Sequence, residues 1–209
     1  MGLTIDQIVK AAPVVPVIVI DDIADAVPLA TALYNGGLKV LEITLRTECA
    51  LAAITAMCEA LPDAIVGAGT IIKPADIDAA VAAGSTFLVS PGTSPELIEA
   101  LKKSPVPVLP GVSTPSEAMK LYAEGFTHLK FFPAEAAGGV SMLKSIGGPL
   151  PQITFCPTGG INLAKAPDYL KLNSVHCVGG SWMCPADLVK AKDWAEIEKR
   201  AREAASLSS

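Results

Sequence analysis

The sequence has few histidines, and its cysteines do not follow a metal-binding pattern. Its 209 residues include two histidines, His128 and His176, and five cysteines without a C-x-x-C pair. Because structural zinc sites take four nitrogen or sulfur ligands, often in closely spaced pairs, we expect neither a metal nor a cofactor. The odd number of cysteines predicts reduced thiols rather than a disulfide framework.

Positive charge and long apolar runs are lacking as well. The formal net charge is −5, which argues against the basic surface of a nucleic-acid-binding protein. The apolar run 11–20 contains two prolines and is too short to cross a membrane. The start, MGLTIDQIVK, lacks the basic segment and long apolar core of a secretory signal. We therefore expect a cytoplasmic protein with neither nucleic-acid nor membrane partners.

Eight short apolar runs recur along the chain, separated by alanine-rich segments with helical spacing. Strands that alternate with helices predict parallel pairing. The expected strands are 14–20, 39–45, 64–70, 86–92, 107–113, 128–134, 153–159 and 174–180. The expected helices are 23–34, 47–60, 74–83, 95–102, 115–124, 137–146, 163–171 and 186–205.

The spacing of these units predicts a closed (β/α)₈ TIM barrel. Each unit takes about 23 residues, and eight of them fill a chain at the small end of the barrel size range. We expect one domain over 1–209 with a short N-terminal helix. An open doubly wound sheet is the alternative, but it would require a G-x-G-x-x-G segment after the first strand, where this sequence reads Asp21-Asp22-Ile23.

A lysine interrupts the run 128–134, which reads HLKFFPA. The run predicts a buried strand, and burial of an ammonium without a partner is costly. Lysine responds to burial by losing its proton, and a neutral amine is a nucleophile. Lys130 is therefore either a surface residue on a segment that is not a strand or a reactive amine in a pocket.

A glutamate interrupts the run 39–45 in the same way. Side chains alternate along a strand, so Glu42, Thr44 and Arg46 share one face, as Lys130 and Phe132 do on theirs. The charges on strands two and six meet only across a barrel interior, where they compensate each other. A structural ion pair would give the same pattern, and the pair alone does not distinguish the two interpretations.

Small and reactive residues follow the ends of the expected strands. They are Thr70, Ser90-Pro91-Gly92, Thr158-Gly159-Gly160 and Gly179-Gly180-Ser181. In (β/α)₈ barrels the site lies at this rim, and phosphate commonly binds after strands seven and eight. The two glycine pairs therefore predict a phosphate cradle of backbone N–H groups, with the Ser181 hydroxyl as a further donor.

Several other unusual residues are expected to be structural. His128 lies near a strand start and is expected as a packed core histidine, and Cys156 as a small core residue. Trp182 and Trp194 are expected to pack against helices. Arg46 differs, because a fixed guanidinium beside Glu42 suits a substrate carboxylate.

Together, these groups predict chemistry on a 2-keto acid that carries a distal phosphate. An amine such as that of Lys130 condenses with a ketone to form a Schiff base, which permits carbon–carbon cleavage next to it. Glu42 would transfer the protons.

Seven motifs in order carry a family resemblance over nearly the whole chain. They are EITLRT (42–47), VGAGT (66–70), SPG (90–92), PG (110–111), KFFPAE (130–135), CPTGG (156–160) and GGSW (179–182). The sequence resembles the 2-keto-3-deoxy-6-phosphogluconate (KDPG) aldolases, which also act on 2-keto-4-hydroxyglutarate (KHG).

The resemblance implies a class I aldolase, an aldehyde-lyase of the Entner–Doudoroff pathway, that yields pyruvate and glyceraldehyde 3-phosphate. Lys130 matches the Schiff-base lysine and Glu42 the general acid/base. Members of the family are commonly homotrimers. The other matched residues fall at the pyruvate end, namely Arg46, Thr70, Pro91 and Phe132, and at the phosphate end, namely Thr158, Gly159, Gly160, Gly180 and Ser181.

Three alternatives stay open at this point. The related aldolase for 2-keto-3-deoxy-6-phosphogalactonate acts on a substrate that differs in one hydroxyl configuration. A phosphosugar isomerase or epimerase on the same barrel would keep the glycine cradle without an imine at Lys130. A catalytically inactive ligand-binding barrel is the third, and retention of both Glu42 and Lys130 argues against it.

Overall fold

The computed structural model describes residues 2–207, in which short strands alternate with helices. The strands are β1 Val14–Ile18, β2 Val40–Thr44, β3 Ile65–Gly69, β4 Leu88–Val89, β5 Val108–Leu109, β6 Gly111–Val112, β7 His128–Phe131, β8 Thr154–Pro157 and β9 Val178–Gly180. The helices are α1 Ile5–Lys10, α2 Ile23–Asn35, α3 Ala50–Ala60, α4 Pro74–Ala82, α5 Pro95–Leu101, α6 Pro115–Ala123, α7 Gly139–Gly147, α8 Ala166–Leu170, α9 Ala186–Lys190 and α10 Trp194–Ala205.

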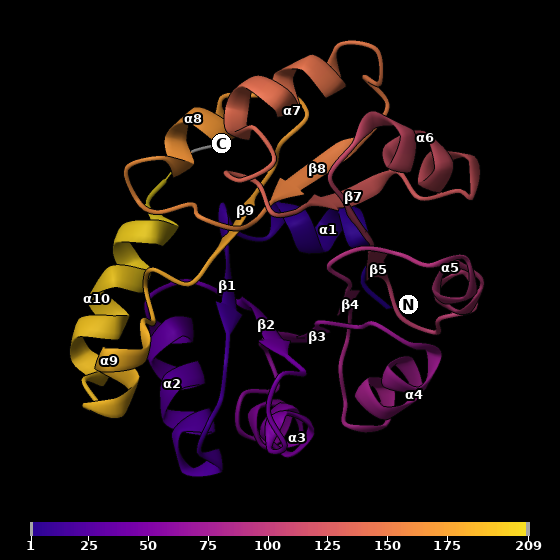
Figure 1. Ribbon diagram of the computed structural model, residues 1–209. Coiled ribbons are helices and arrows are strands. Elements are labelled where there is room, and N and C mark those ends of the chain that lie inside the picture. Colours follow the sequence, from indigo (N-terminus) through magenta and orange to yellow (C-terminus); the bar gives the residue numbers. More distant parts are fainter. Residues whose placement is uncertain (1, 208–209) are drawn as a thin grey trace.

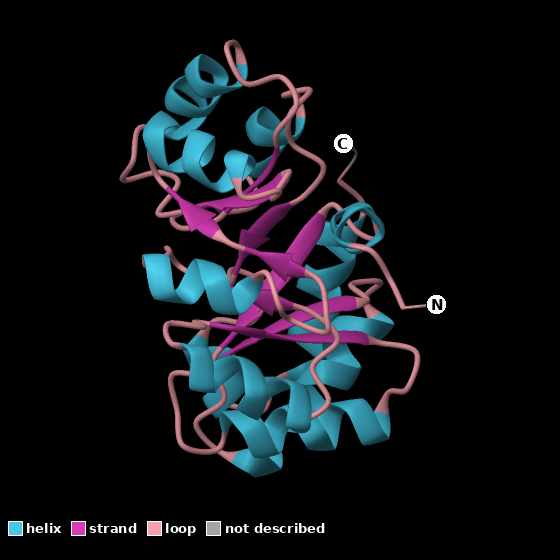
Figure 2. Cartoon of the chain, turned by 90° about the vertical axis from the view of Figure 1, so that its right-hand side faces the viewer, coloured by secondary structure: helices cyan, strands magenta, loops and turns pink. Residues whose placement is uncertain are grey.

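The strands pair in parallel within two sheets. A six-stranded sheet has the order β5-β4-β3-β2-β1-β9, and a three-stranded sheet has the order β6-β7-β8. The larger sheet curls as a half-barrel, with helices on the outside (Figure 1). Figure 2 shows the same strands between helices on either side. The last strand pairs with the first and β1 to β5 follow in sequence, so the strand order differs from that of the doubly wound alternative.

The α/β class is confirmed, but the described strands do not form one continuous ring of eight. The expected strand 107–113 is divided at Pro110 into β5 and β6, which belong to different sheets. Proline has no N–H to donate to a ladder, which accounts for the break. Between the β8 and β9 sides the pairing is limited to two isolated parallel bridges.

The helix boundaries follow from local capping. Ser94 and Thr114 cap α5 and α6, since each hydroxyl accepts a hydrogen bond from the backbone N–H three residues later. The expected helix 186–205 is instead two helices. Lys192 takes a positive φ of 55° between them, and the Asp193 side chain caps α10.

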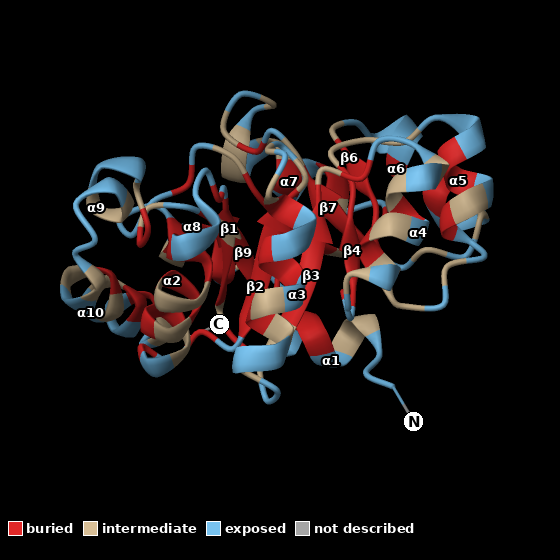
Figure 3. Cartoon of the chain, turned by 90° about the horizontal axis from the view of Figure 1, so that it is seen from below, coloured by how far each residue is buried: buried red, intermediate tan, exposed pale blue. Residues whose placement is uncertain are grey.

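Helix α1, Ile5–Lys10, lies near the N-terminus and packs against the ends of the strands. Ile8 and Val9 are buried in a cluster with strand residues that include Val15, Val40 and Leu109. Figure 3 shows α1 beneath the strands, with buried residues concentrated in the strands and on the helix faces that meet them.

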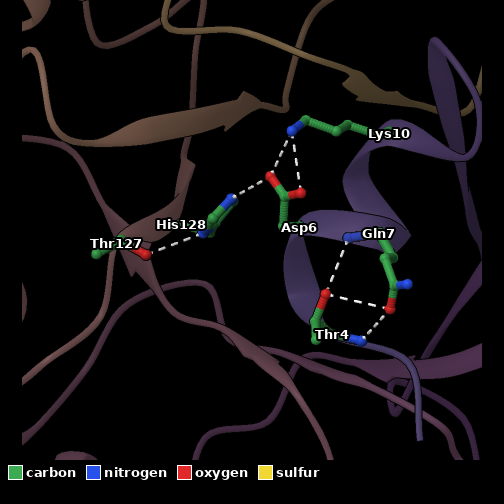
Figure 4. A network of polar contacts seen from close by, with 6 residues as sticks. All are labelled: Thr4, Asp6, Gln7, Lys10, Thr127 and His128. Atoms are coloured by element: carbon green, nitrogen blue, oxygen red, sulfur yellow. Dashed lines mark hydrogen bonds and ion pairs between the residues drawn. The ribbon is translucent and has the colours of Figure 1, made fainter.

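A polar network joins α1 to the start of β7 (Figure 4). The Nε2 atom of His128 lies 3.3 Å from Oδ1 of Asp6, which also forms a 2.8 Å ion pair with Lys10. The other ring nitrogen lies 3.0 Å from the Thr127 hydroxyl. His128 is therefore half-buried and hydrogen-bonded rather than enclosed in the core.

Between residues 2 and 207, no helix combines the length and apolar character needed to cross a membrane. The same residues contain no group of three or more His, Cys, Asp or Glu side chains placed to hold a metal ion.

Candidate active site

The two charged strand residues meet inside the protein. The Lys130 ammonium donates a 3.0 Å hydrogen bond to Oε1 of Glu42, and the two side chains are 5% and 4% exposed. Lys130 lies on β7 in the smaller sheet and Glu42 on β2 in the larger one, so the pair spans the space between the sheets. Lys130 is therefore not a surface lysine, and each charge has the other as its partner.

Strand register holds both residues in place. Glu42 lies on β2, which pairs with β1 and β3, and Lys130 lies on β7 between Gly111 of β6 and Cys156 of β8. Cys156 is buried, as the sequence predicts. Because both backbones are held on two sides, neither side chain can leave the pair without a rotamer change or a broken ladder.

Gly69 leaves the space that the Glu42 carboxylate occupies. A Cβ atom at Gly69 would lie 2.2 Å from Oε1 of Glu42, far inside van der Waals contact. Oε1 is also the atom that accepts the hydrogen bond from Lys130. A side chain at position 69 would therefore displace the ion pair itself.

Most of the predicted site residues line one cavity of about 150 Å³. They are Arg46, Lys130, Phe132, Thr158, Gly159, Gly160, Gly180 and Ser181. The Lys130 ammonium lies 5.4 Å from the centre of the Phe132 ring, a distance at which the ring face attracts a cation. A larger cavity of about 550 Å³ adjoins it at Val17 and Ser181, but Lys130 does not line that one.

Thr70 and Pro91 lie outside the lining of the smaller cavity. Nε of Arg46 donates a 3.1 Å hydrogen bond to the Thr70 hydroxyl, so Thr70 reaches the cavity through Arg46. Thr70 has a φ of +62°, which is unfavourable for a β-branched residue and is typical of strained functional positions. The backbone of Pro91 lies against Gly111. A Cβ atom at Gly111 would lie 2.4 Å from the carbonyl carbon of Pro91.

The glycines at the predicted phosphate end are required for two different reasons. Gly159 and Gly160 have φ values of +107° and +77°, which residues with a side chain rarely adopt. At Gly180 the constraint is space, because a Cβ would lie 2.1 Å from the Trp182 ring. The sequence predicts that Trp182 packs against helices. In the structure its ring also packs against the loop that contains Gly180. Phosphate binding by these loops stays a prediction.

Sequence reasoning missed two kinds of residue. Val17 and Ile161 also line the cavity, and nothing distinguishes them from other apolar residues in the sequence. Glu135 belongs to the KFFPAE motif, but the sequence alone indicates no role for it. Its carboxylate accepts hydrogen bonds from Tyr169 and Lys165. The signal that could identify it is a charged residue four positions after the end of β7, the strand of Lys130.

Comparisons with known sequences identify the family of this chain. A family model for KDPG and KHG aldolases matches residues 5–200. A 2-dehydro-3-deoxy-phosphogluconate aldolase of Dickeya dadantii is 52% identical over 199 residues, covering 95% of this chain and 93% of that protein. A KHG/KDPG aldolase of Escherichia coli is 50% identical with the same coverage.

Solved structures extend the comparison to the fold. A KDPG aldolase from Legionella pneumophila, with pyruvate captured as a covalent carbinolamine, is 48% identical with a TM-score of 0.93 and covers 95% of this chain and 97% of that one. A KDPG aldolase from Zymomonas mobilis is 47% identical with a TM-score of 0.94, covering 99% and 98%. On the extent of these matches, the chain belongs to the KDPG and KHG aldolase family.

Proposed function

We propose that this protein is a class I aldolase that cleaves KDPG to pyruvate and glyceraldehyde 3-phosphate through an imine on Lys130. The observation that carries the proposal is the buried 3.0 Å pair of Lys130 and Glu42, with Lys130 lining a small cavity. An amine placed beside a carboxylate can pass its proton to that carboxylate and so become a nucleophile. Family membership supports the same reaction class.

The first half of the reaction forms the imine. Glu42 takes a proton from the Lys130 ammonium, and the free amine attacks the C2 carbonyl of the substrate. The carbinolamine then loses its hydroxyl as water, with a proton returned by Glu42, and an iminium remains. The carboxylate is suited to both transfers because it already accepts the hydrogen bond of the amine.

The second half breaks the C3–C4 bond. A base, assigned here to Glu42, takes the C4 hydroxyl proton, and the C3–C4 electron pair moves toward the iminium as the phosphorylated aldehyde leaves. The resulting enamine takes a proton at C3, and water hydrolyses the iminium to release pyruvate and free Lys130. The proton that Glu42 removes from the C4 hydroxyl thus balances the one that C3 receives.

The remaining residues orient the two ends of the substrate. Arg46, held by Thr70, is assigned to the keto-acid carboxylate, with Phe132 and Pro91 beside the pyruvate carbons. Thr158, Gly159, Gly160, Gly180 and Ser181 are assigned to the phosphate end. KHG carries a distal carboxylate in place of the phosphate, and we infer that the same cavity accepts it.

We also infer that the chain, 1–209, is one domain in which the two sheets close into a single (β/α)₈ barrel. Parallel bridges of Phe155 with Val175 and of Thr158 with Gly179 support closure on one side. On the other side only Pro110 separates β5 from β6. The ion pair across the interior supports the same arrangement.

Assembly as a homotrimer is inferred from the family resemblance alone, and light scattering of the purified protein tests it. A cytoplasmic location is supported by the cysteines, all five of which are free thiols.

Turnover of three keto acids side by side tests the proposed function. Pyruvate release is measured with KDPG, with its phosphogalactonate epimer and with KHG. We expect the largest kcat/KM with KDPG and measurable cleavage of KHG. A larger kcat/KM for the epimer would favour the phosphogalactonate aldolase, and isomerisation without pyruvate release would favour the isomerase.

A further inference from the structure

Glu135 connects the segment after β7 to helix α8 and the residue before it, beside the Gly159-Gly160 pair. It follows β7, the strand of Lys130. Its Oε1 accepts a 2.5 Å hydrogen bond from the Tyr169 hydroxyl, and its Oε2 accepts one of 2.5 Å from the Lys165 ammonium. Tyr169 lies on α8, and Lys165 is the residue directly before that helix. Both partners therefore follow Gly159-Gly160 in the chain.

The backbone of the same segment contacts the glycine loop directly. The N–H of Glu135 donates a 3.1 Å hydrogen bond to the carbonyl of Gly159, and the N–H of Ala134 donates one of 2.8 Å to Thr158. A Cβ at Gly160 would lie 2.8 Å from Cβ of Glu135. The Glu135 side chain is therefore packed against the loop that it also holds by its backbone.

Charge and burial make this contact persistent. Tyr169 is fully buried, and burial together with the Glu135 carboxylate raises the pKa of its hydroxyl. Hydrogen bonds from Lys165 and Tyr169 lower the pKa of Glu135. The tyrosine therefore stays a donor and the glutamate an ionised acceptor at neutral pH, which gives a charge-assisted hydrogen bond.

We propose that Glu135 and Tyr169 are positioning residues that fix the Gly159-Gly160 loop for the phosphate end of the substrate. Two glycines in sequence give a loop many accessible conformations, so an external contact is needed to select one. Neither Glu135 nor Tyr169 lines the cavity, and both act through the loop. The proposal rests on the proposed function and adds a specificity element to it.

Two conservative variants test the proposal. Glu135→Gln keeps the shape but removes the charge, and Tyr169→Phe removes one oxygen from a buried ring. For each we expect kcat/KM with KDPG to fall about tenfold or more, mainly through KM, because small displacements of positioning groups are costly. Pyruvate imine formation, measured by borohydride trapping, should change by less than about twofold, since Lys130 is held by Glu42 and Arg46 by Thr70 rather than by Glu135 or Tyr169.

Matched controls come from the same chain. Tyr122→Phe removes a hydroxyl from an exposed tyrosine on α6. Lys165→Met removes one partner of Glu135, whereas Lys171→Met removes an exposed ion pair with Asp168 on the same stretch. Lys165→Met should weaken KDPG use in the same direction as Glu135→Gln, and the other two should leave it unchanged.

Amide hydrogen exchange supplies a readout that does not depend on turnover. Exchange in 158–162 should accelerate in Glu135→Gln and Tyr169→Phe but not in the controls. Unchanged KDPG kinetics and exchange, or an equal loss for KDPG and the pyruvate imine, would overturn the positioning role. Failure of the unaltered protein to trap pyruvate would instead count against the proposed function, while the exchange result still decides whether Glu135 and Tyr169 fix the Gly159-Gly160 loop.

Discussion

Nζ of Lys130 lies 3.0 Å from Oε1 of Glu42, in surroundings where neither side chain is more than 5% exposed. Removal of one partner from such a pair leaves the other charge uncompensated and costs about 3–5 kcal/mol of folding free energy. Variants of the pair must therefore keep volume and hydrogen bonding, and their folding must be measured together with their turnover.

Glu42→Gln is expected to lower turnover of KDPG by roughly 10²–10⁴-fold, the usual contribution of a positioned acid or base. The amide retains the shape and can still accept a hydrogen bond from Lys130, but it cannot carry a proton. The measurement is kcat with the melting temperature as a folding control. Near-normal turnover in a folded variant would reduce Glu42 to a structural partner of Lys130.

Gly69→Ala tests the position of the Glu42 carboxylate without altering a titratable group. The added methyl would lie 2.2 Å from Oε1 of Glu42, so the carboxylate must move. We expect a loss of about 10²-fold in kcat, in line with the cost of misplaced catalytic groups. Gly148→Ala is the matched control, because the nearest atom to its Cβ would be 3.8 Å away. Equal activity of the two variants would contradict the assigned geometry.

The buried pair of Lys130 and Glu42 could be predicted from the sequence because a charge in an apolar run is conspicuous. Lys130 and Glu42 each interrupt a strand, and parity places each on a defined face. The glycine loops were predictable for the same reason, since repeated glycines at strand ends restrict the possible explanations.

Other features depend on contacts that sequence patterns do not encode. The break at Pro110 follows from one missing N–H, although the surrounding residues predict a continuous strand. The contact of Glu135 with Tyr169 joins residues 34 positions apart and has no periodic signature. The sequence predicts a core position for His128 and misses its contact with Asp6, because Asp6 lies on a helix whose docking position the sequence does not specify.

Ser181→Asp tests the phosphate end. Ser181 is exposed and lines the cavity, so a carboxylate there fits without repacking and occupies the region assigned to phosphate. The kcat/KM for KDPG should fall sharply, and that for KHG by less, because one carboxylate gains less from the loops than a phosphate dianion. The diagnostic quantity is the ratio of the two kcat/KM values. If substitution leaves the ratio unchanged, phosphate binds elsewhere.

His128 makes stability pH-dependent. Burial lowers the pKa of His128 below its ordinary value of 6.5, although Asp6 opposes the shift. The unfolded chain therefore takes up a proton at a higher pH than the folded protein does. The contribution of His128 to stability is complete above pH 6.5 and is lost as the pH falls through the lower, folded pKa.

Denaturant unfolding between pH 7 and pH 5 measures this contribution. The free energy of unfolding should decline less steeply with acidification in His128→Gln than in the unaltered protein. Turnover at pH 7 should be unaffected, because His128 contacts α1 and not the cavity. Identical slopes for the two proteins would contradict a lowered pKa of His128 in the folded protein.

The identity of the amine that forms the imine is the central claim, and borohydride trapping with pyruvate tests it most directly. Reduction converts an imine to a stable secondary amine, and peptide mass mapping locates it. The account predicts a single labelled peptide modified at Lys130, and no label in Lys130→Arg, whose guanidinium stays protonated. Label on another lysine, or no label on a folded protein, would contradict it.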